Sequence, residues 1–299
     1  MRIIVTGREG QVVRSLIERA SGDAEIVPLG RPELDLAGDA DAIVAAVTSA
    51  QPDVIVSAAA YTQVDRAEAE KELAFAVNER GPRAVAIAAR QCGVPLIHIS
   101  TDYVFDGAKD APYLEDEPTA PASVYGASKL AGEKAVREEQ PDSAVLRTAW
   151  VYSPFGANFL KTMLRLAGER DEVTVVADQR GNPTSALDIA DAILAVAVNL
   201  RRTDQPAQRG IFHMSATGEA SWAEFAEAIF ATSASVGGPS ARVKHIRTAD
   251  YPTAARRPAN SRLDSTKLQR AHGVRLPDWH SSMKDVVARL LDGGIQGAM

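Results

Sequence analysis

Tyr125 and Lys129 are the residues of this sequence whose types and spacing best suit acid–base chemistry. They stand four residues apart, so they lie on one face of a helix predicted for residues 125–139. A free phenol has a pKa of about 10 and carries protons poorly at neutral pH. A neighbouring ammonium favours the phenolate, and we therefore expect Lys129 to lower the pKa of Tyr125. Because this spacing is also frequent by chance on surface helices, the pair needs supporting residues.

A hydroxyl group is expected beside this pair, at the end of the strand predicted for residues 95–100. Thr101 is the preferred hydroxyl, and Ser100 is the alternative. Ligands of open α/β sheets bind at the carboxyl ends of the strands, so a hydroxyl there can orient a carbonyl group beside the phenol. A Ser-Thr-Asp run is also common as a turn. Together, Thr101, Tyr125 and Lys129 form a candidate catalytic set for chemistry at a carbonyl group.

The segment after the first predicted strand has the spacing of a nucleotide-binding turn. Gly7 and Gly10 allow a sharp turn, and the amides of Gln11 and Val12 can then approach a pyrophosphate at the start of the next helix. By itself, Gly-x-x-Gly also fits an ordinary strand-to-helix turn. Its position in the first turn of an alternating pattern favours a dinucleotide site. Val13 stands where a third glycine is expected, so we predict somewhat looser packing of the helix without loss of the site.

The end of the second predicted strand indicates which dinucleotide is bound. An acidic residue there would bind the adenosine ribose and favour NAD. The strand instead runs into Gly30 and Arg31, and Arg8 lies in the glycine turn. Either guanidinium could bind a 2′-phosphate through paired hydrogen bonds, although both could also be ordinary solvated side chains. We therefore predict NADP(H) as the favoured cofactor, with NAD(H) as the alternative.

Strand-like and helix-like segments alternate through the first half of the chain, and these elements must position the candidate site. Strands are predicted at residues 2–6, 25–29, 53–57, 95–100 and 143–147, with helices between or after them at residues 11–20, 40–50, 71–92 and 125–139. Such alternation implies right-handed crossovers and a mostly parallel sheet that is covered on both faces. We therefore predict an α/β fold with a doubly wound, Rossmann-like parallel sheet.

The second half is more irregular and reads as a smaller C-terminal α/β lobe that binds the substrate. We predict a dinucleotide-binding domain at residues 1–150 and mainly a substrate-binding lobe at residues 151–299, with residues of about 173–200 returning to the first domain. The expected elements are a helix at residues 158–168, a strand at 173–176, a helix at 188–200, a strand at 211–214, a capped helix from residue 221, a loop at 233–240 and a frayed end at 293–299.

Composition restricts the class of protein. The chain has 299 residues, of which 45% are hydrophobic but only 5% aromatic, so its core is expected to be aliphatic. The net charge of −6 argues against a general nucleic-acid or anionic-membrane binder. A single cysteine, Cys92, excludes an intramolecular disulfide. There is no apolar run of membrane-spanning length, and a strand is predicted at the first residues, so we expect a soluble, cytoplasmic protein without a signal peptide.

Several longer segments resemble the dTDP-4-dehydrorhamnose reductases, within the extended short-chain dehydrogenase/reductase superfamily. The glycine turn and the Tyr-x-x-x-Lys pair mark only the superfamily, whereas the Ser-Thr-Asp-Tyr-Val-Phe-Asp-Gly run is far more specific. The similarity covers nearly the whole chain, and its clearest segments are residues 5–12, 57–68, 77–78, 100–107, 125–133, 146–152, 178–184 and 257–264.

This resemblance implies reduction of the 4-keto group of a dTDP-6-deoxy-4-keto hexose to give dTDP-L-rhamnose. It implies that Tyr125 donates the proton, that Lys129 tunes Tyr125 and holds the cofactor, and that Thr101 positions the carbonyl. It further implies a cofactor-binding set that adds Asp35, Leu36, Ala59, Ala60 and Tyr61, and a substrate-binding set that adds Asp102, Tyr103 and Trp150. For Tyr103, core packing is an almost equally good interpretation. Asn78 is expected to be structural.

The resemblance does not decide whether the chain binds a metal ion or whether it forms a dimer. Some members of the family bind magnesium at a dimer interface through glutamates, so a homodimer is possible here. The matching positions hold Ser15 and Leu187, so we expect no metal site.

Two other functions are alternatives. A related nucleotide-sugar reductase or dehydratase is the nearest, but a dehydratase usually carries a second acid where Tyr103 follows Asp102. The other is a non-catalytic regulatory subunit similar to that of methionine adenosyltransferase. The intact Thr101, Tyr125 and Lys129 set favours the reductase.

Overall fold

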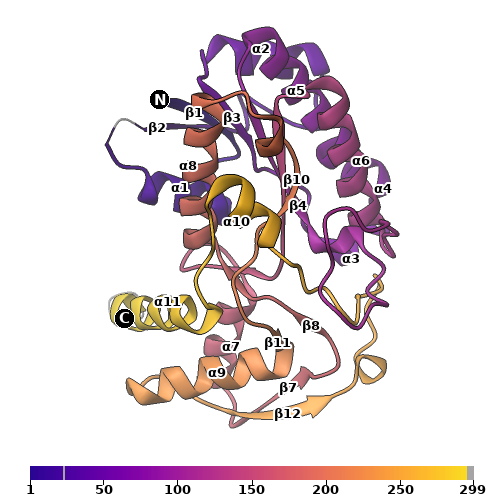
Figure 1. The fold of residues 1–299 in the computed structure, drawn as a ribbon. Helices are drawn as coiled ribbons and strands as arrows, with labels where there is room; N and C mark the ends of the chain where they lie inside the picture. Colours follow the sequence, from indigo (N-terminus) through magenta and orange to yellow (C-terminus); the bar gives the residue numbers. More distant parts are fainter. Residues whose placement is uncertain (23, 295–299) are drawn as a thin grey trace.

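A six-stranded, all-parallel sheet forms the centre of the larger lobe of the computed structural model, which describes residues 1–22 and 24–294 (Figure 1). The strand order is β10-β5-β4-β3-β1-β2, so the order reverses between β1 and β3. The predicted doubly wound parallel sheet is confirmed. The strands of the sheet are β1 Arg2–Thr6, β2 Glu25–Leu29, β3 Val54–Ser57, β4 Leu96–Thr101, β5 Ser143–Thr148 and β10 Gly210–His213.

Helices cover both faces of the sheet because successive strand residues point to opposite faces. On one face, Ile3 and Val5 pack against α1 and α8, and on the other Ile4 packs against α2 and α5. This is why the strands are aliphatic on both sides. The helices around the sheet are α1 Gln11–Arg19, α2 Ala40–Ser49, α3 Val64–Ala67, α4 Lys71–Phe75, α5 Gly81–Cys92, α6 Val124–Glu139, α8 Ala186–Arg202 and α10 Thr266–His272.

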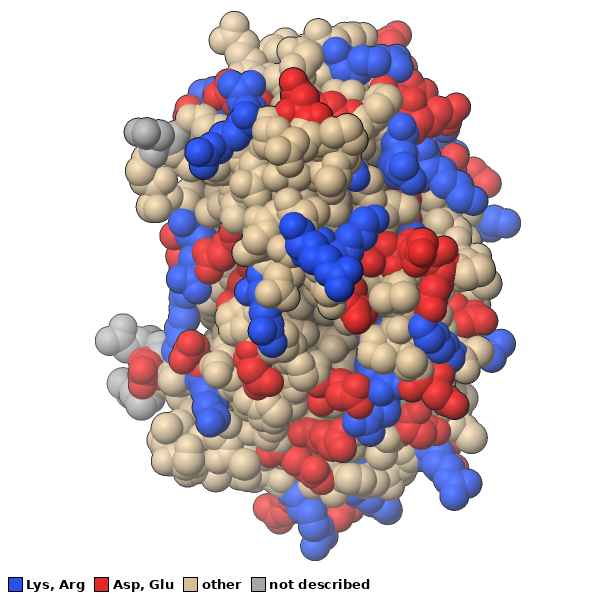
Figure 2. Space-filling view, viewed as in Figure 1, with Lys and Arg blue, Asp and Glu red and all other residues tan. Residues whose placement is uncertain are grey.

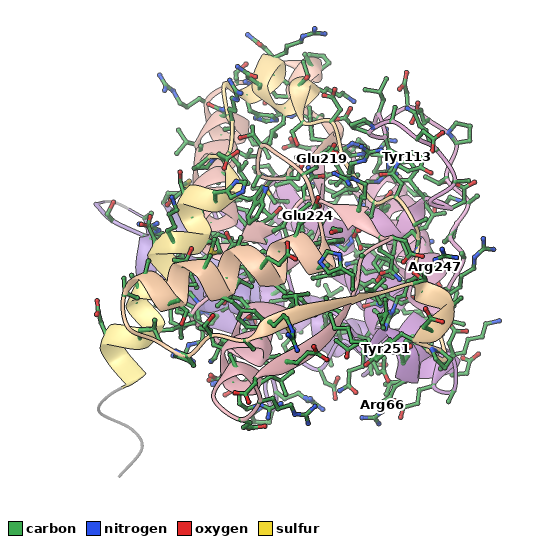
Figure 3. The ribbon with its side chains drawn as sticks, turned by 90° about the horizontal axis from the view of Figure 1, so that it is seen from below. Arg66, Tyr113, Glu219, Glu224, Arg247 and Tyr251 are labelled. Atoms are coloured by element: carbon green, nitrogen blue, oxygen red, sulfur yellow. The ribbon has the colours of Figure 1, made fainter. Side chains whose placement is uncertain are left out.

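A second, smaller lobe lies below the sheet in Figure 1 and has its own apolar core. Its main strands, β7 and β12, pair in parallel, and α9 lies alongside β12 (Figure 3). Helix α9 begins with a capping box between Ser221 and Glu224, as the sequence predicted. The elements of this lobe are β6 Val151–Tyr152, α7 Phe159–Ala167, β7 Glu172–Val176, β8 Arg180–Gly181, β9 Thr184–Ser185, β11 Ala220–Ser221, α9 Trp222–Ser235, β12 Arg242–Ile246 and α11 Trp279–Gly294.

The range predicted to return to the first domain, about 173–200, is divided between the two cores. Strand β7 stays in the smaller lobe with β12, whereas α8 packs on α1. The structure also brings β10 and α10 back to the sheet, which the sequence pattern did not indicate. The chain therefore crosses between the lobes more than once, and a division at residue 150 stays a prediction.

Three local predictions need correction. Residues 71–92 do not form one helix, because a π-helical segment at Ala76–Arg80 separates α4 from α5. The loop predicted at residues 233–240 begins later, since α9 continues to Ser235. At the predicted frayed end, residues 293 and 294 belong to α11, and residues 295–299 lie outside the described part of the chain. Short 3-10 turns occupy Asp102–Val104, Pro206–Gln208 and Thr248–Asp250.

The surface carries both signs of charge. Figure 2 shows basic side chains interspersed with acidic ones over the face that it presents. Many of these side chains form exposed ion pairs, such as Arg2 with Glu25 at 2.8 Å and Arg165 with Glu169 at 2.8 Å. Across residues 1–22 and 24–294, no helix is both long enough and apolar enough to cross a membrane.

Candidate active site

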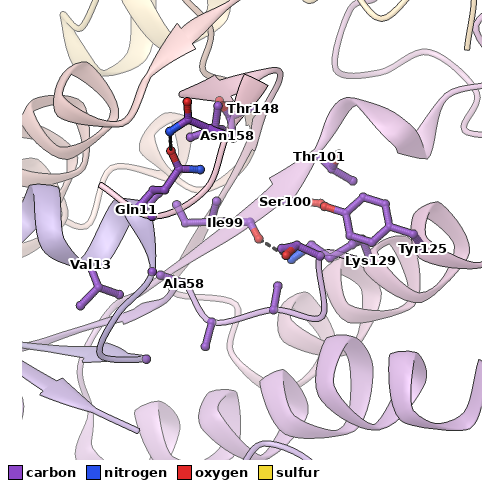
Figure 4. A pocket seen from close by; sticks show the side chains of 18 of the residues that line it. Gln11, Val13, Ala58, Ile99, Ser100, Thr101, Tyr125, Lys129, Thr148 and Asn158 are labelled. Carbon is purple, nitrogen blue, oxygen red and sulfur yellow. Dashed lines mark hydrogen bonds between the residues drawn. The ribbon is translucent and has the colours of Figure 1, made fainter. Parts of the chain in front are cut away.

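A cavity of about 660 Å³ opens at the carboxyl ends of β1, β3, β4 and β5 (Figure 4). One side is formed by the ends of these strands and by α6, and the other by the loop that precedes α7. The cavity brings together most of the predicted site residues: Gly7, Gly10, Gln11, Val12, Ala59, Ala60, Thr101, Asp102, Tyr103, Tyr125, Lys129 and Trp150. Four predicted residues do not line it, namely Arg31, Asp35, Leu36 and Tyr61.

The glycine turn forms one end of the cavity. Gly7 has a φ of +99°, and a Cβ atom there would lie 3.3 Å from the Cβ of Ala59, so both the backbone conformation and the space favour glycine. Gly10 is the N-cap of α1 and contributes no side-chain cap. The N–H groups of the first turn of α1 are thus available to an anion, and the positive end of the helix dipole points the same way. These features fit the pyrophosphate of a dinucleotide.

Val13 is packed in the core at the start of α1, and the looser packing that the sequence predicted stays a prediction. Its side chain is only 2% exposed and belongs to the core between α1, α8 and the sheet. One of its methyl groups fills the space beside Gly7. The β-branched side chain therefore takes the volume that a third glycine would leave open, and it still lines the cavity.

The candidate proton donor lies beside its hydroxyl partner, as the sequence predicted. Thr101 donates a hydrogen bond to Asp102 Oδ1 at 2.8 Å and accepts one from the Tyr103 amide at 3.2 Å. The enclosed position of Tyr125 raises the pKa of its phenol, and a hydrogen bond with Thr101 opposes this rise. Ser100, the alternative hydroxyl, is instead engaged with Glu133 at 2.5 Å. Thr101 is therefore the better placed of the two.

Lys129 does not act on Tyr125 in the way that its spacing predicted. Its ammonium group is buried and donates a hydrogen bond to the Ile99 carbonyl at 2.6 Å (Figure 4). Burial lowers the pKa of Lys129 to about 8, while the nearby Glu133 carboxylate raises it. In the protein by itself, desolvation and the nearby Asp102 carboxylate raise the pKa of Tyr125, which is opposite to the lowering expected from Lys129. A phenol with a raised pKa keeps its proton at neutral pH, which is the form that donates.

The residues predicted to face the substrate form an aromatic wall. The Tyr103 and Tyr125 rings meet edge to face, with centroids 5.6 Å apart. Trp150 stacks on Trp222 with centroids 3.6 Å apart and donates from its indole nitrogen to Ser261 at 3.0 Å. Its backbone has a φ of +48°, a strained conformation for a bulky residue. Such strain at a cavity wall indicates that surrounding contacts impose the position of this ring.

Asp102 combines burial with an incompletely satisfied carboxylate. It is only 3% exposed, and burial raises the pKa of its carboxyl group to about 7, although hydrogen bonds from Thr101 and Ser261 oppose that rise. Its Oδ2 atom has no hydrogen-bond partner within the described protein. Because Oδ2 is itself enclosed by the protein, Asp102 forms part of the cavity wall without presenting this oxygen to the cavity.

The four predicted residues outside the cavity wall have other contacts. Leu36 packs in the core against Gly81, where a Cβ would lie 2.6 Å from the Leu36 carbonyl oxygen. Asp35 is exposed and accepts from the Ala37 amide, and Arg31 is exposed at the end of β2. Tyr61 donates to Glu70 at 2.6 Å. Their roles in cofactor binding stay predictions.

Two further expectations concern residues beside the cavity. Asn78 is buried, accepts from the Tyr61 amide at 2.8 Å and donates to Ser128 at 3.0 Å, which agrees with a structural role. Arg8 is paired with Glu33 at 2.6 Å on the surface. It would have to leave this partner to bind a phosphate.

Sequence reasoning missed the loop before α7. Gly156, Ala157 and Asn158 line the cavity next to Gln11 at the start of α1. Gln11 Oε1 accepts hydrogen bonds from Ser153 Oγ at 2.8 Å and from Asn158 Nδ2 at 3.0 Å (Figure 4). These partners lie more than 140 residues from Gln11. No local sequence pattern reports such a contact.

Comparisons with known proteins identify the family. A family model described as the RmlD substrate binding domain matches residues 1–291. A dTDP-4-dehydrorhamnose reductase of Sinorhizobium fredii is 52% identical over 294 residues, covering 98% of this chain and 99% of the relative. One from Escherichia coli K12 is 41% identical over 296 residues, covering 97% and 98%. This chain belongs to the dTDP-4-dehydrorhamnose reductase family. The resemblance predicted from the sequence is confirmed.

Solved structures of the dTDP-4-dehydrorhamnose reductase family share the fold along the whole chain. One from Clostridium acetobutylicum has a TM-score of 0.90 at 34% identity, covering 97% of this chain and 100% of the other. One from Bacillus anthracis, in complex with NADP, has a TM-score of 0.88 at 36% identity, covering 96% and 99%.

The two positions that the sequence analysis matched to magnesium ligands stay a prediction. Ser15 and Leu187 are both buried. In residues 1–22 and 24–294, no three or more His, Cys, Asp and Glu side chains gather in a way that could hold a metal ion.

Proposed function

We propose that this protein is an NADPH-dependent oxidoreductase that reduces the 4-keto group of dTDP-4-dehydro-6-deoxy-L-mannose (dTDP-4-dehydrorhamnose) to give dTDP-L-rhamnose. The observation that carries the proposal is the convergence of Thr101, Tyr125 and Lys129 in one cavity with the glycine turn. Membership of the dTDP-4-dehydrorhamnose reductase family supports the substrate, and the NADP bound in the Bacillus anthracis relative supports the cofactor.

The residues of the cavity divide the work between proton transfer and positioning. When bound, NADPH supplies the hydride that reduces the ketone carbon. Tyr125 donates its phenolic proton to the ketone oxygen, and Thr101 holds that oxygen beside the phenol by a hydrogen bond. The charged ammonium of Lys129 stabilises the phenolate left behind and binds the ribose next to the nicotinamide. Its anchor on the Ile99 carbonyl fixes its position in the cavity floor.

The nucleotide sugar is proposed to lie against the aromatic wall. Tyr103 and Trp150 offer ring faces and edges to the sugar, and Asp102 lines the cavity beside them. Trp150 is held by both Trp222 and Ser261, so it provides a fixed surface.

The cofactor preference is proposed to depend on the arginines near the end of β2. Arg31 is exposed and Arg8 is held by Glu33, so both can turn toward a 2′-phosphate. Asp35 and Leu36 are proposed to border the adenine. NAD(H) remains the alternative cofactor.

The test mixes the purified protein with NADPH and dTDP-4-dehydro-L-rhamnose and identifies the sugar product. We expect loss of NADPH absorbance in proportion to dTDP-L-rhamnose formed. Binding of NADPH without its consumption would contradict the proposal and favour a regulatory subunit. Release of water from an unreduced nucleotide hexose would favour a dehydratase, which the Asp102-Tyr103 sequence disfavours because it lacks the second acid. A homodimeric assembly and a cytoplasmic location stay predictions from the sequence.

A further inference from the structure

A buried ion pair lies one helical turn beyond Lys129 on α6. Glu133 Oε1 accepts from Arg147 Nε at 2.9 Å, and Glu133 Oε2 accepts from Arg147 Nη2 at 2.7 Å. Both side chains are only 1% exposed. Enclosing two charges costs free energy that their attraction only partly returns, so stability alone is a poor explanation for the pair.

Glu133 also connects α6 to the strand that carries the catalytic hydroxyl. Ser100 donates to Glu133 Oε1 at 2.5 Å. Ser100 and Arg147 face each other across β4 and β5, and the next pair in this register is Thr101 with Thr148. One carboxylate therefore holds both strands where they reach the cavity: at Ser100, which lines it, and at Arg147, which precedes the lining residue Thr148.

The same helix bears the phenol and the ammonium. Tyr125, Lys129 and Glu133 follow one another at intervals of four residues, so they share one face of α6. Lys129 binds the Ile99 carbonyl and Glu133 binds the Ser100 hydroxyl, so two consecutive residues of β4 are held by two consecutive turns of α6. The placement of α6 along β4 decides how far the phenol lies from the hydroxyl of Thr101.

We propose that Glu133 is a positioning residue for the proposed reduction: its buried carboxylate fixes α6 on the ends of β4 and β5, and thereby holds Tyr125 against Thr101. This inference rests on the proposed function. It assigns a role in turnover to a residue that does not line the cavity.

The charge of Glu133 has a second effect, on Lys129. The titratable groups that act on Lys129 are Glu133 from α6 and His98 from β4, and Arg147 of β5 is bound to Glu133. Burial lowers the pKa of His98 well below its usual value, so that ring is neutral. Glu133 is then the negative charge that opposes the desolvation of Lys129, and its loss lowers the pKa of Lys129 further.

The test removes the charge without leaving a lone buried ion. The double variant Glu133→Gln/Arg147→Met replaces both partners, because Glu133→Gln alone would strand a buried guanidinium and could fail to fold. Ser100→Ala is the second variant and removes the connection between Glu133 and β4, at a residue that also lines the cavity. Glu138→Gln is the matched control, since Glu138 lies on the same helix but pairs with Arg83 at the surface.

We expect the double variant to lose kcat by about 10- to 100-fold with little change in the KM for NADPH, because misplacement of a reacting group by about 1 Å costs that much. Ser100→Ala should lose less, and Glu138→Gln should match the unchanged protein. The decline of kcat at high pH should move to lower pH in the double variant. The Cε resonance of Lys129, assigned with Lys129→Arg in protein carrying ¹³C-lysine, should titrate at lower pH as well.

A double variant that melts earlier but keeps kcat and the pH profile would overturn the positioning role and leave a structural one. No turnover in the unchanged protein would contradict the proposed function, and with it the role in reduction. The Lys129 titration needs no turnover, so it would still decide whether Glu133 sets the charge of Lys129.

Discussion

The two walls of the cavity are built in different ways. The wall of β4 and α6 is buried, and its contacts join strands and helix through charged groups such as Lys129 and Glu133. The opposite wall, the loop at residues 153–158, is partly exposed and is held by neutral hydrogen bonds from Ser153 and Asn158 to Gln11. The guanidinium carbon of Arg14 lies 4.5 Å from the centroid of the Phe155 ring, and that of Arg289 lies 5.1 Å from it.

The two walls therefore suit different tasks. The first holds the reacting groups in place, and the second admits the dinucleotide. Groups that transfer a proton need fixed distances, and buried charge-assisted contacts supply them. A dinucleotide that enters and leaves needs a wall that opens, and neutral hydrogen bonds contribute only about 1 kcal/mol each. We therefore expect variants in the first wall to change turnover or folding, and variants in the second to change exchange of the cofactor.

The largest effect is expected from Tyr125→Phe in the first wall. This variant removes the proton donor and keeps the ring, so kcat should fall by about 10²- to 10⁴-fold while NADPH binding stays nearly unchanged. Steady-state turnover and a fluorescence titration of NADPH measure the two quantities. Full activity in this variant would contradict the assignment of Tyr125 as the proton donor.

The rigidity of the same wall is tested by Gly132→Ala. A Cβ atom at Gly132 would lie 2.0 Å from the Asn78 carbonyl oxygen, so α6 would have to move away from the π-helical segment. We expect a loss of more than about 2 kcal/mol in stability, seen as a melting temperature lower by about 5 °C or more. Gly168→Ala is the control, since its nearest neighbour would be 3.4 Å away. If Gly132→Ala melted at the same temperature as the unchanged protein, α6 could shift without loss of stability, and this wall would not be rigid.

The opening of the second wall is tested by Asn158→Asp. The aspartate keeps the oxygen that caps α7 at the Lys161 amide but loses the donor to Gln11. We expect NADPH to dissociate about 5- to 10-fold faster, as measured by stopped-flow displacement, with the melting temperature nearly unchanged. An unchanged dissociation rate would show that this loop does not limit release.

The smallest effect is expected outside both walls, at Arg8 in the glycine turn and Arg31 after β2. Replacing Arg8 and Arg31 with alanine together should lower the preference for NADPH over NADH, as a ratio of kcat/KM values, by roughly 3- to 10-fold. The effect is small because Arg8 must first leave Glu33. An unchanged ratio, with NADH used as well as NADPH, would remove both arginines from cofactor selection.

The sequence predicted the sheet well and the connections between lobes poorly. Strands β1 and β2 have the predicted bounds, because a short aliphatic run is a local signal. The interruption of residues 71–92 was missed, since the π-helical segment is stabilised by Asn78, whose partners Tyr61 and Ser128 lie elsewhere in the chain. The return of β10 and α10 to the sheet was missed for the same reason.

The sequence by itself determined which groups stand together on one element: Tyr125 and Lys129 on a helix face, Thr101 at a strand end, and the glycines of the first turn. These follow from helical and strand periods, which a single segment fixes. Only the tertiary structure decided the pKa values of the site residues and the contacts of the loop at residues 153–158. The pKa of Tyr125 rises because of what encloses it, and Gln11 meets Asn158 because two lobes pack together. Burial and long-range contact are properties of the assembled chain, so no local pattern carries them.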